Sequence, residues 1–237
     1  MQRKEELAKN ANFNTKMVEV ATKILSKNDK EANRLREVWK THKDLYVINL
    51  MSSPGSGKTT MLEGLADTKS FEFGVIEGDL ETNRDAERLE AKGVRAYQIT
   101  TGNACHLEAK MVSNALENFK LDGLDLLFIE NVGNLVCPAS YDLGAHLNVA
   151  LLSIPEGDDK VLKYPTMFRT VDALIITKWD LKPHFDFDEN RVRDDLKQLN
   201  PNAKVFTLSS KDESIKDIVS YFSECKSSGF ISESVFI

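Results

Sequence analysis

Apolar residues follow two patterns along most of the chain: short continuous runs, and stretches in which they recur every three or four positions. Continuous runs such as DLLFIE and DALIIT are typical of parallel strands that are buried on both faces of a sheet. Stretches with helical spacing predict amphipathic helices. Because the two patterns alternate from Leu45 onward, the sequence predicts an α/β fold built on a doubly wound, mostly parallel sheet.

The alternation places seven strands and five helices. The strands are expected at Leu45–Met51, Phe73–Glu77, Arg95–Ile99, Leu124–Ile129, Val149–Ile154, Ala173–Thr177 and Lys204–Leu208. The helices are expected at Lys58–Leu65, Thr82–Ala91, Leu107–Phe119, Glu189–Gln198 and Ile215–Phe222. Ligands of such sheets bind beyond the carboxyl ends of the strands, so the functional residues are expected in the loops at that edge.

The first 44 residues differ from the rest of the chain. They are rich in Lys, Glu and Asn and contain neither Gly nor Pro. Apolar residues recur with helical spacing on both sides of Asn28-Asp29, which predicts two short amphipathic helices. We therefore expect an N-terminal helical extension over residues 1–44, a phosphate-loop domain over residues 45–225 and a C-terminal tail over residues 226–237.

Composition narrows the class of protein. A chain of 237 residues can bury a core without disulfides, and its three cysteines favour a reducing compartment. A net charge of −6 argues against nucleic acid or an anionic membrane as the main partner. No apolar run approaches the roughly 20 residues of a membrane span, and the polar N-terminus does not resemble a secretory signal. We expect a cytoplasmic protein.

The strongest motif is SSPGSGKTT, which starts at Ser52 between a predicted strand and a predicted helix. It is close to the phosphate-loop pattern G-x-x-x-x-G-K-[ST], with Ser at the position of the first Gly. Backbone N–H groups of such a loop surround an anion, the lysine reaches the β- and γ-phosphates, and the next hydroxyl binds Mg²⁺. Nucleotide binding is expected at Gly55, Ser56, Gly57, Lys58, Thr59 and Thr60.

Two acidic residues end predicted strands near this loop. Asp79 follows VIEG and Glu130 ends LLFIE, where phosphate-loop proteins hold a carboxylate that orients Mg²⁺ or the attacking water. Asp79 can instead cap the helix that follows it, and that alternative stays open. Gly133 is expected to donate its backbone N–H to a γ-phosphate. The next residue is Asn134 and not a water-orienting Gln, so we expect slow hydrolysis, about 10⁻⁴ to 10⁻² per second.

Two later motifs indicate which base is bound. TKWD at residues 177–180 resembles the guanine motif N-K-x-D, with Thr in place of Asn. The Asp180 carboxylate can accept both N–H groups of guanine, and the Lys178 stem can cover the base. Ser210 and Lys211 lie in a loop similar to the S-A-K loop that backs the base. This order of motifs favours GTP over ATP, with an ATP-dependent kinase or a ParA-like ATPase as the alternative.

Three residues are candidate metal ligands. Cys105 and His106 are adjacent, and Cys137 follows the run ENVGNLV. Thiolate and imidazole suit Ni²⁺ or Zn²⁺. Their spacing alone does not distinguish ligands from buried cysteines, and three ligands leave a tetrahedral site incomplete. The residues by themselves leave both interpretations open.

Six long runs between about residues 28 and 212 are more specific than general phosphate-loop motifs: NLMSSPGSGKTT, VIEGDLETNRDAERL, TGNACHLEAKMV, LLFIENVGNLVCPASYDLGAH, SIPEGDDKVLKYPTMF and TKWDLKPHFDFD. They resemble the HypB family of hydrogenase nickel-incorporation GTPases. The resemblance implies a GTPase that binds GTP, GDP and Mg²⁺, forms a homodimer favoured by GTP, and delivers nickel to the [NiFe]-hydrogenase large subunit with a HypA-like metallochaperone. It also implies that Cys105, His106 and Cys137 bind Ni²⁺ or Zn²⁺ near the dimer interface.

The chain also departs from the family. Its N-terminus lacks the C-x-x-C-G-C or His-rich stretch of some members, and the usual G-G-C-H is N-A-C-H at residues 103–106. One alternative is a urease accessory GTPase of the UreG type, which typically has Cys-Pro-His. Another is a regulatory GTPase switch whose cysteines are core residues. Because Cys137 lies seven residues after Glu130, we hypothesise that nucleotide-driven movement of this segment shifts a metal ligand.

Overall fold

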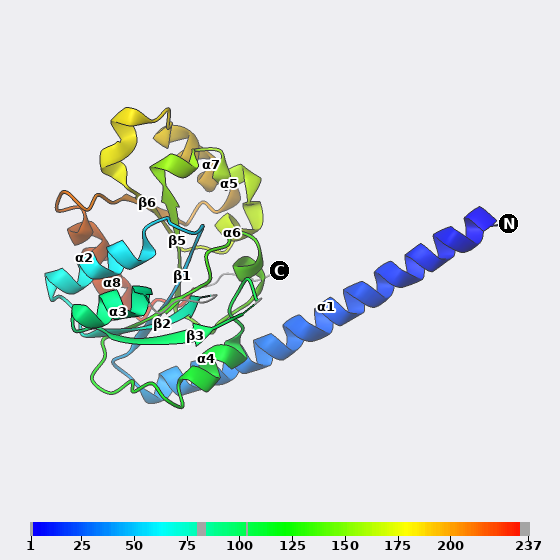
Figure 1. Cartoon of the computed structure of the whole chain (residues 1–237), viewed down its shortest axis with the longest axis horizontal. Coiled ribbons are helices and arrows are strands. Elements are labelled where there is room, and N and C mark those ends of the chain that lie inside the picture. Colours follow the sequence, from blue (N-terminus) through cyan, green and yellow to red (C-terminus); the bar gives the residue numbers. More distant parts are fainter. Residues whose placement is uncertain (1, 80–83, 103, 233–237) are drawn as a thin grey trace.

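The computed structural model describes residues 2–79, 84–102 and 104–232, with side chains from residue 22 onward. Seven parallel strands form one sheet in the order β3-β2-β4-β1-β5-β6-β7 (Figure 1). The strands are β1 (Tyr46–Ser52), β2 (Phe73–Asp79), β3 (Arg95–Thr100), β4 (Leu126–Glu130), β5 (Leu147–Ser153), β6 (Ala173–Thr177) and β7 (Lys204–Thr207). The predicted α/β fold with a parallel, doubly wound sheet is confirmed.

Helices cover both faces of the sheet (Figure 1). They are α1 (Gln2–Thr41), α2 (Lys58–Thr68), α3 (Arg84–Ala91), α4 (Ala109–Ala115), α5 (Lys160–Lys163), α6 (Pro165–Arg169), α7 (Glu189–Leu199) and α8 (Ile215–Ser228), with short 3-10 helices at Cys137–Ser140, Ile154–Glu156 and Trp179–His184. Helices α2, α3 and α8 share a buried cluster with one face of the sheet. On the other face, α1 and α4 form one cluster, and α6 and α7 form another.

The prediction of two short helices at the N-terminus is wrong, because α1 is a single helix. Asn28, which suggested a break, is 6% exposed and bridges two other segments. Its side-chain amide donates to the carbonyl of Asp142 at 2.8 Å and accepts the N–H of Ala109 at 2.9 Å. Further along, Trp39 is 1% exposed and donates its indole N–H to the carbonyl of Gly144. The last turns of α1 are therefore part of the domain core.

Other element ends also differ from the prediction. The helix expected over Leu107–Phe119 spans only α4, and the expected start at Thr82 lies outside the described residues. Helix α8 continues to Ser228, past the domain end expected at residue 225. Beyond it, the chain packs back onto the domain, where Phe230 accepts a hydrogen bond from the Tyr46 hydroxyl at 2.9 Å.

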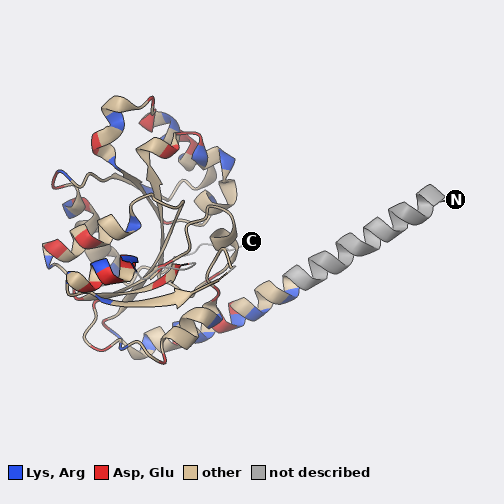
Figure 2. Cartoon of the chain, viewed as in Figure 1, with Lys and Arg blue, Asp and Glu red and all other residues tan. Residues whose placement is uncertain are grey.

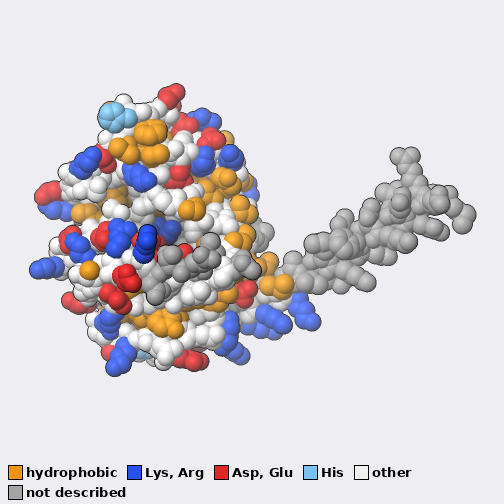
Figure 3. All heavy atoms as spheres, in the orientation of Figure 1, with side chains coloured by type: hydrophobic (Ala, Val, Ile, Leu, Met, Phe, Trp, Pro, Cys, Tyr) orange, Lys and Arg blue, Asp and Glu red, His pale blue; other side chains and the backbone are white. Residues whose placement is uncertain are grey.

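The surface mixes charges of both signs. Lys and Arg alternate with Asp and Glu along the outer helices (Figure 2). On the face shown in Figure 3, apolar side chains form small groups among charged ones. Among the described residues, no helix combines the length and apolar character needed to cross a membrane.

Candidate functional site

The loop between β1 and α2 has the backbone that a phosphate loop requires. Gly55 and Gly57 have φ values of 70° and 96°, in the left-handed region that favours glycine. The Lys58 ammonium donates to the Ser52 hydroxyl at 3.0 Å. Ser52, which stands where the pattern has Gly, thus holds the lysine at the end of β1. Thr59, the residue after Lys58, is buried in the first turn of α2.

Two buried glutamates lie side by side at this edge of the sheet. Glu77 of β2 and Glu130 of β4 are partners in the parallel register, and each is 3% exposed. The Lys58 ammonium is 3.8 Å from the Glu130 carboxylate. Burial, followed by the charge of Glu130 as the second largest cause, raises the pKa of Glu77 to about 8. Burial also raises the pKa of Glu130 to about 7. Asp79 ends β2 at the same edge of the sheet.

The segment after β4, residues 131–137, is called the switch segment below. Its Gly133 lies against the phosphate loop, so closely that a Cβ atom there would be 2.9 Å from the Cα and N atoms of Pro54. Only glycine allows this approach without a shift of the backbone. The switch segment therefore contacts the loop in which a terminal phosphate is expected.

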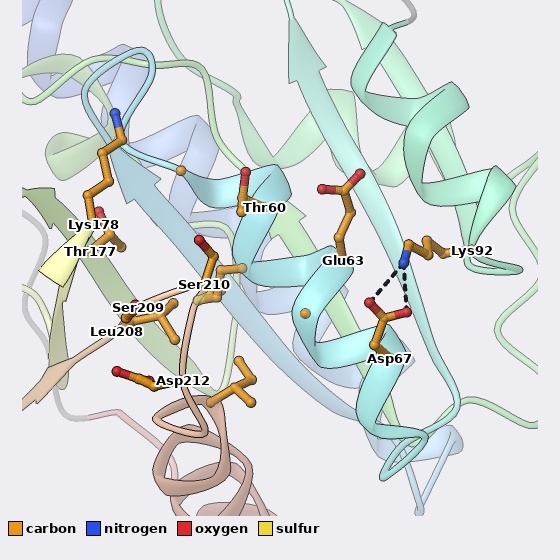
Figure 4. Close-up of a pocket in the computed structure, with 14 residues that line it drawn as sticks. Thr60, Glu63, Asp67, Lys92, Thr177, Lys178, Leu208, Ser209, Ser210 and Asp212 are labelled. Carbon is orange, nitrogen blue, oxygen red and sulfur yellow. Dashed lines mark hydrogen bonds and ion pairs between the residues drawn. The ribbon is translucent and has the colours of Figure 1, made fainter. Parts of the chain in front are cut away.

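A cavity of about 610 Å³ lies beside the phosphate loop (Figure 4). Its volume is in the range of small-molecule sites. The predicted residues Gly57, Thr60, Lys178 and Ser210 line it, and they come from the phosphate loop, from α2 and from the loops after β6 and β7. The cavity thus combines the end of the phosphate loop with the two motifs expected to bind a base.

The TKWD motif is tied directly to the phosphate loop. The Thr177 hydroxyl donates to the carbonyl of Ser56 at 2.5 Å, and the Lys178 ammonium donates to the carbonyl of Gly55 at 2.7 Å. Thr177 therefore links the two motifs although it replaces the expected Asn. Asp180 forms an ion pair with Lys211 at 2.7 Å, and the two predicted base-binding loops meet through it.

Cys105, His106 and Cys137 lie together, with their ligand atoms all within 4.8 Å of one another. The two Sγ atoms are 2.9 Å apart, and the His106 Nδ1 is 3.7 Å from the Cys105 Sγ. All three cysteines of the chain are free thiols, and the third, Cys225, is buried in α8. The structure therefore brings the three predicted ligands together from the loops after β3 and β4.

The imidazole of His106 is held in place by its neighbours. It stacks on the ring of Tyr141 at 3.8 Å between centroids, and its Nε2 is 3.9 Å from the Glu108 carboxylate. Burial lowers the pKa of His106, which favours the neutral form that binds metals. Two thiols and a neutral imidazole form a donor set that suits Ni²⁺ or Zn²⁺.

Sequence reasoning missed two carboxylates at the nucleotide edge. Glu77 gave no local signal, because its role follows from the register of β2 beside β4. Glu156 accepts a hydrogen bond from the Ser56 hydroxyl of the phosphate loop at 2.7 Å. It also forms a capping box with Ser153. The run SIPE has the spacing of that box, so this residue was detectable from the sequence.

Comparisons with known proteins agree with one another. Residues 46–207 match the family model described as CobW/HypB/UreG, nucleotide-binding domain. A hydrogenase/urease maturation factor HypB from Helicobacter hepaticus is 54% identical, over 100% of this chain and 99% of that protein. A hydrogenase maturation factor HypB from Escherichia coli is 46% identical, over 82% of this chain and 68% of that protein.

Solved structures give the same result. The crystal structure of HypB from Helicobacter pylori in complex with nickel is 55% identical, with a TM-score of 0.86 over 89% of this chain and 100% of that chain. HypB from Archaeoglobus fulgidus is 34% identical, with a TM-score of 0.78 over 85% of this chain and 100% of that chain. The signal recognition particle receptor FtsY from Elizabethkingia anophelis, at 16% identity and a TM-score of 0.50 over 75% of this chain and 63% of that chain, shares the fold.

Proposed function

The chain belongs to the HypB family of maturation factors, and from that premise we propose that it is a GTP-hydrolysing nickel metallochaperone. In this proposal it delivers nickel to the active site of a [NiFe]-hydrogenase during maturation. The observation that carries the proposal is the grouping of Cys105, His106 and Cys137 within 4.8 Å, beside a segment that contacts the phosphate loop. The related HypB from Helicobacter pylori was crystallised with nickel, which supports the choice of metal.

The nucleotide in this proposal is GTP or GDP with Mg²⁺. Mg²⁺ would supply charge neutralisation at the phosphates, and the donor set fits it: the Thr59 hydroxyl, Asp79 and Glu130, of which Glu130 has a buried carboxylate oxygen without a hydrogen-bond partner. Lys58 would move from Ser52 and Glu130 to the β- and γ-phosphates. Because Asn134 follows Gly133 where a water-orienting Gln is expected, hydrolysis is expected to be slow, as in a switch.

Nucleotide selectivity in this proposal comes from the two loops after β6 and β7. Asp180 accepts both N–H groups of guanine once Lys211 makes room, and Lys178 covers the base while Ser210 backs it. The cavity beside the phosphate loop supports this assignment, because Lys178 and Ser210 line it. Adenine offers no matching pair of donors to a carboxylate, so GTP is preferred over ATP.

The proposed partners follow from the family. We expect a homodimer favoured by GTP, a HypA-like metallochaperone that exchanges nickel, and the hydrogenase large subunit as recipient. The relatives from Helicobacter are named hydrogenase/urease maturation factors, whereas those from Azotobacter and Escherichia are named hydrogenase maturation factors. The 54% identity to the former supports urease accessory proteins as a second destination of the nickel. All of these partners imply a cytoplasmic protein.

The test is nickel binding at equilibrium, with the protein held in its GDP form and then in complex with a non-hydrolysable GTP analogue. We expect near-stoichiometric binding, an affinity that differs between the two forms, and a loss of binding in Cys137→Ala. Cys225→Ala is the matched control, because it removes a thiol that lies outside the cluster.

Weak binding that ignores both the nucleotide and Cys137→Ala would contradict the metal assignment. Zinc competition in the same titration distinguishes the two candidate metals. Competition by GTP and ATP for the nucleotide site tests the guanine assignment separately, since an ATP-dependent kinase would reverse the preference.

A further inference from the structure

The loop that carries Cys105 and His106, residues 104–107, is called the ligand loop below. The switch segment forms hydrogen bonds with it at two points, one on each side of His106. The side-chain amide of Asn134 donates to the carbonyl of Cys105 at 3.3 Å. The side-chain oxygen of Asn131 accepts the backbone N–H of Leu107 at 3.1 Å. Cys105 and Leu107 are the residues directly before and after His106, so the backbone on both sides of the imidazole is tied to the switch segment.

Asn131 is the buried member of this pair. It follows Glu130 directly, it is 1% exposed, and its side-chain oxygen also accepts the N–H of Val132 at 3.0 Å. One oxygen thus joins the start of the switch segment to the backbone of Leu107. A buried N–H that loses its acceptor is costly, so the ligand loop is expected to follow Asn131 when the switch segment moves.

Asn134 contacts the backbone beside both cysteines. Its amide group reaches the carbonyl of Cys105, and its side-chain oxygen accepts the N–H of Val136, the residue before Cys137, at 2.8 Å. The side chain is therefore a bridge between the two segments that carry thiol ligands. Its position sets how far apart these segments lie.

Gly133 lies between the two asparagines in sequence and against Pro54 of the phosphate loop in space. Gly133 is therefore the point at which the switch segment would respond to a terminal phosphate in this loop. Because Asn134 is its neighbour and Asn131 is two residues before it, a movement of Gly133 reaches both contacts to the ligand loop.

We propose that Asn131 and Asn134 are positioning residues that transmit the nucleotide state to the nickel site. This inference rests on the proposed function and specifies how that function is regulated. Movement of Gly133 changes the two hydrogen bonds, which changes the placement of His106 and Cys105 relative to Cys137. The nickel affinity then differs between nucleotide forms because the ligand geometry differs.

The experiment measures the ratio of two nickel dissociation constants, one with GDP and one with a non-hydrolysable GTP analogue. We expect a ratio of about five-fold or more in the unmodified protein, in the usual range of coupling between sites. Asn134→Asp keeps the acceptor for Val136 but loses the donor to Cys105, so its ratio is expected to fall to within about two-fold of one. Any general effect of the added charge on affinity acts in both forms and cancels in the ratio.

Asn131 offers a paired test. Asn131→Ala removes the acceptor for the Leu107 N–H, so its ratio is expected to fall to within about two-fold of one. Asn131→Asp keeps that acceptor and loses only the long contact, 3.5 Å, that the Asn131 amide donates to Asn49, so its ratio is expected to stay at about five-fold or more.

Asn200→Ala is the matched control: Asn200 is partly buried and donates its side-chain amide to the carbonyls of Arg169 and Val171, away from the ligand loop and from Asn131. Thermal unfolding of each variant shows whether it is folded. If Asn131→Ala is not, Asn134→Asp keeps the test decisive, because Asn134 is only partly buried.

Linkage supplies a second readout. The nucleotide changes the nickel affinity by a certain factor, and nickel must change the ratio of the GDP and GTP-analogue affinities by the same factor. A variant that loses the first effect must therefore also lose the second. If Asn134→Asp and Asn131→Ala keep the ratio, the inference is wrong while nickel delivery stands. A protein that binds nickel equally in both forms overturns the inference and the expected dependence of nickel affinity on nucleotide, while the nickel site itself stands. A protein that binds no nickel overturns the proposed function as well.

Discussion

At the scale of single residues, the pair formed by Glu77 and Glu130 is the most unusual feature of the nucleotide edge. Two carboxyl groups on neighbouring strands are buried, and each has an oxygen without a hydrogen-bond partner. Burial favours a proton on this pair, although the Lys58 ammonium lies 3.8 Å from the Glu130 carboxylate. The unpaired oxygens match the place where a phosphate loop holds Mg²⁺.

This pair predicts how stability depends on pH in the protein without nucleotide. Folding raises the pKa of Glu77 from the usual 4.5 to about 8, so between these values the folded state keeps a proton that the unfolded state has lost. The contribution of Glu77 to stability is thus most favourable near pH 5 and is lost as the pH rises toward 8. Glu77→Gln has no proton to lose, so we expect it to gain stability relative to the unmodified protein over that window, on the order of 2 kcal/mol.

Chemical denaturation at pH 5.5 and pH 8 measures this difference. Glu37→Gln, on the exposed surface of α1, is the control and should leave the pH dependence as it is. If the free energy of unfolding changed equally with pH in Glu77→Gln and in the unmodified protein, Glu77 would be ionised in the folded state.

At the scale of elements, α1 belongs to the core although its sequence reads as an extension. Its residues Ala32, Leu35 and Trp39 are fully buried in the cluster that also contains Val112 of α4 and Val47 of β1. Helix α4 directly follows the loop that carries two of the candidate metal ligands. The anchoring of α1 therefore also stabilises the base of that loop.

We expect Trp39→Ala to lower the free energy of unfolding by about 3 to 5 kcal/mol, because it leaves a large cavity and an unpaired carbonyl at Gly144. Denaturant titration measures this loss. Val38→Ala is the matched control, since Val38 precedes it on the same helix and is 36% exposed. A loss below about 1 kcal/mol for Trp39→Ala would show that α1 is only loosely attached.

At the scale of the whole molecule, the metal cluster lies beside an exposed apolar residue. Val136, directly before Cys137, is 56% exposed. Three ligands leave a tetrahedral site one short, and a second copy across a two-fold axis can supply the fourth. We therefore expect the dimer favoured by GTP to bury the switch segment.

Val136→Asp tests this expectation. In a two-fold interface it brings two carboxylates near each other, so we expect the dissociation constant of the GTP-analogue dimer to rise at least about ten-fold. Sedimentation equilibrium measures it. Phe230→Asp is the control, because Phe230 is 40% exposed and follows α8, where its carbonyl accepts from Tyr46 at the start of β1. Unchanged dimerisation of Val136→Asp would place the interface elsewhere.

The sequence by itself determined the sheet, the phosphate loop and the identity of the candidate ligands. The five inner strands can be predicted because parallel strands covered on both faces are mostly apolar, whereas the edge strands β3 and β7 are only partly buried and give a weaker signal. The phosphate loop can be recognised in the sequence because its glycines, lysine and hydroxyl residues lie within nine consecutive positions. The resemblance to HypB rested on similar continuous runs. In each case the signal is local, so the order of residues along the chain is enough.

Only the tertiary structure decided what depends on distant residues. The single helix α1 persists through Asn28 because the side chain bonds Ala109 and Asp142, far along the chain. Glu77 became part of the nucleotide edge through strand register. Asn131 and Asn134 became contacts to the ligand loop through hydrogen bonds to backbone groups. A hydrogen bond to a backbone group places no demand on the type of its partner residue, so it leaves no pattern in the sequence.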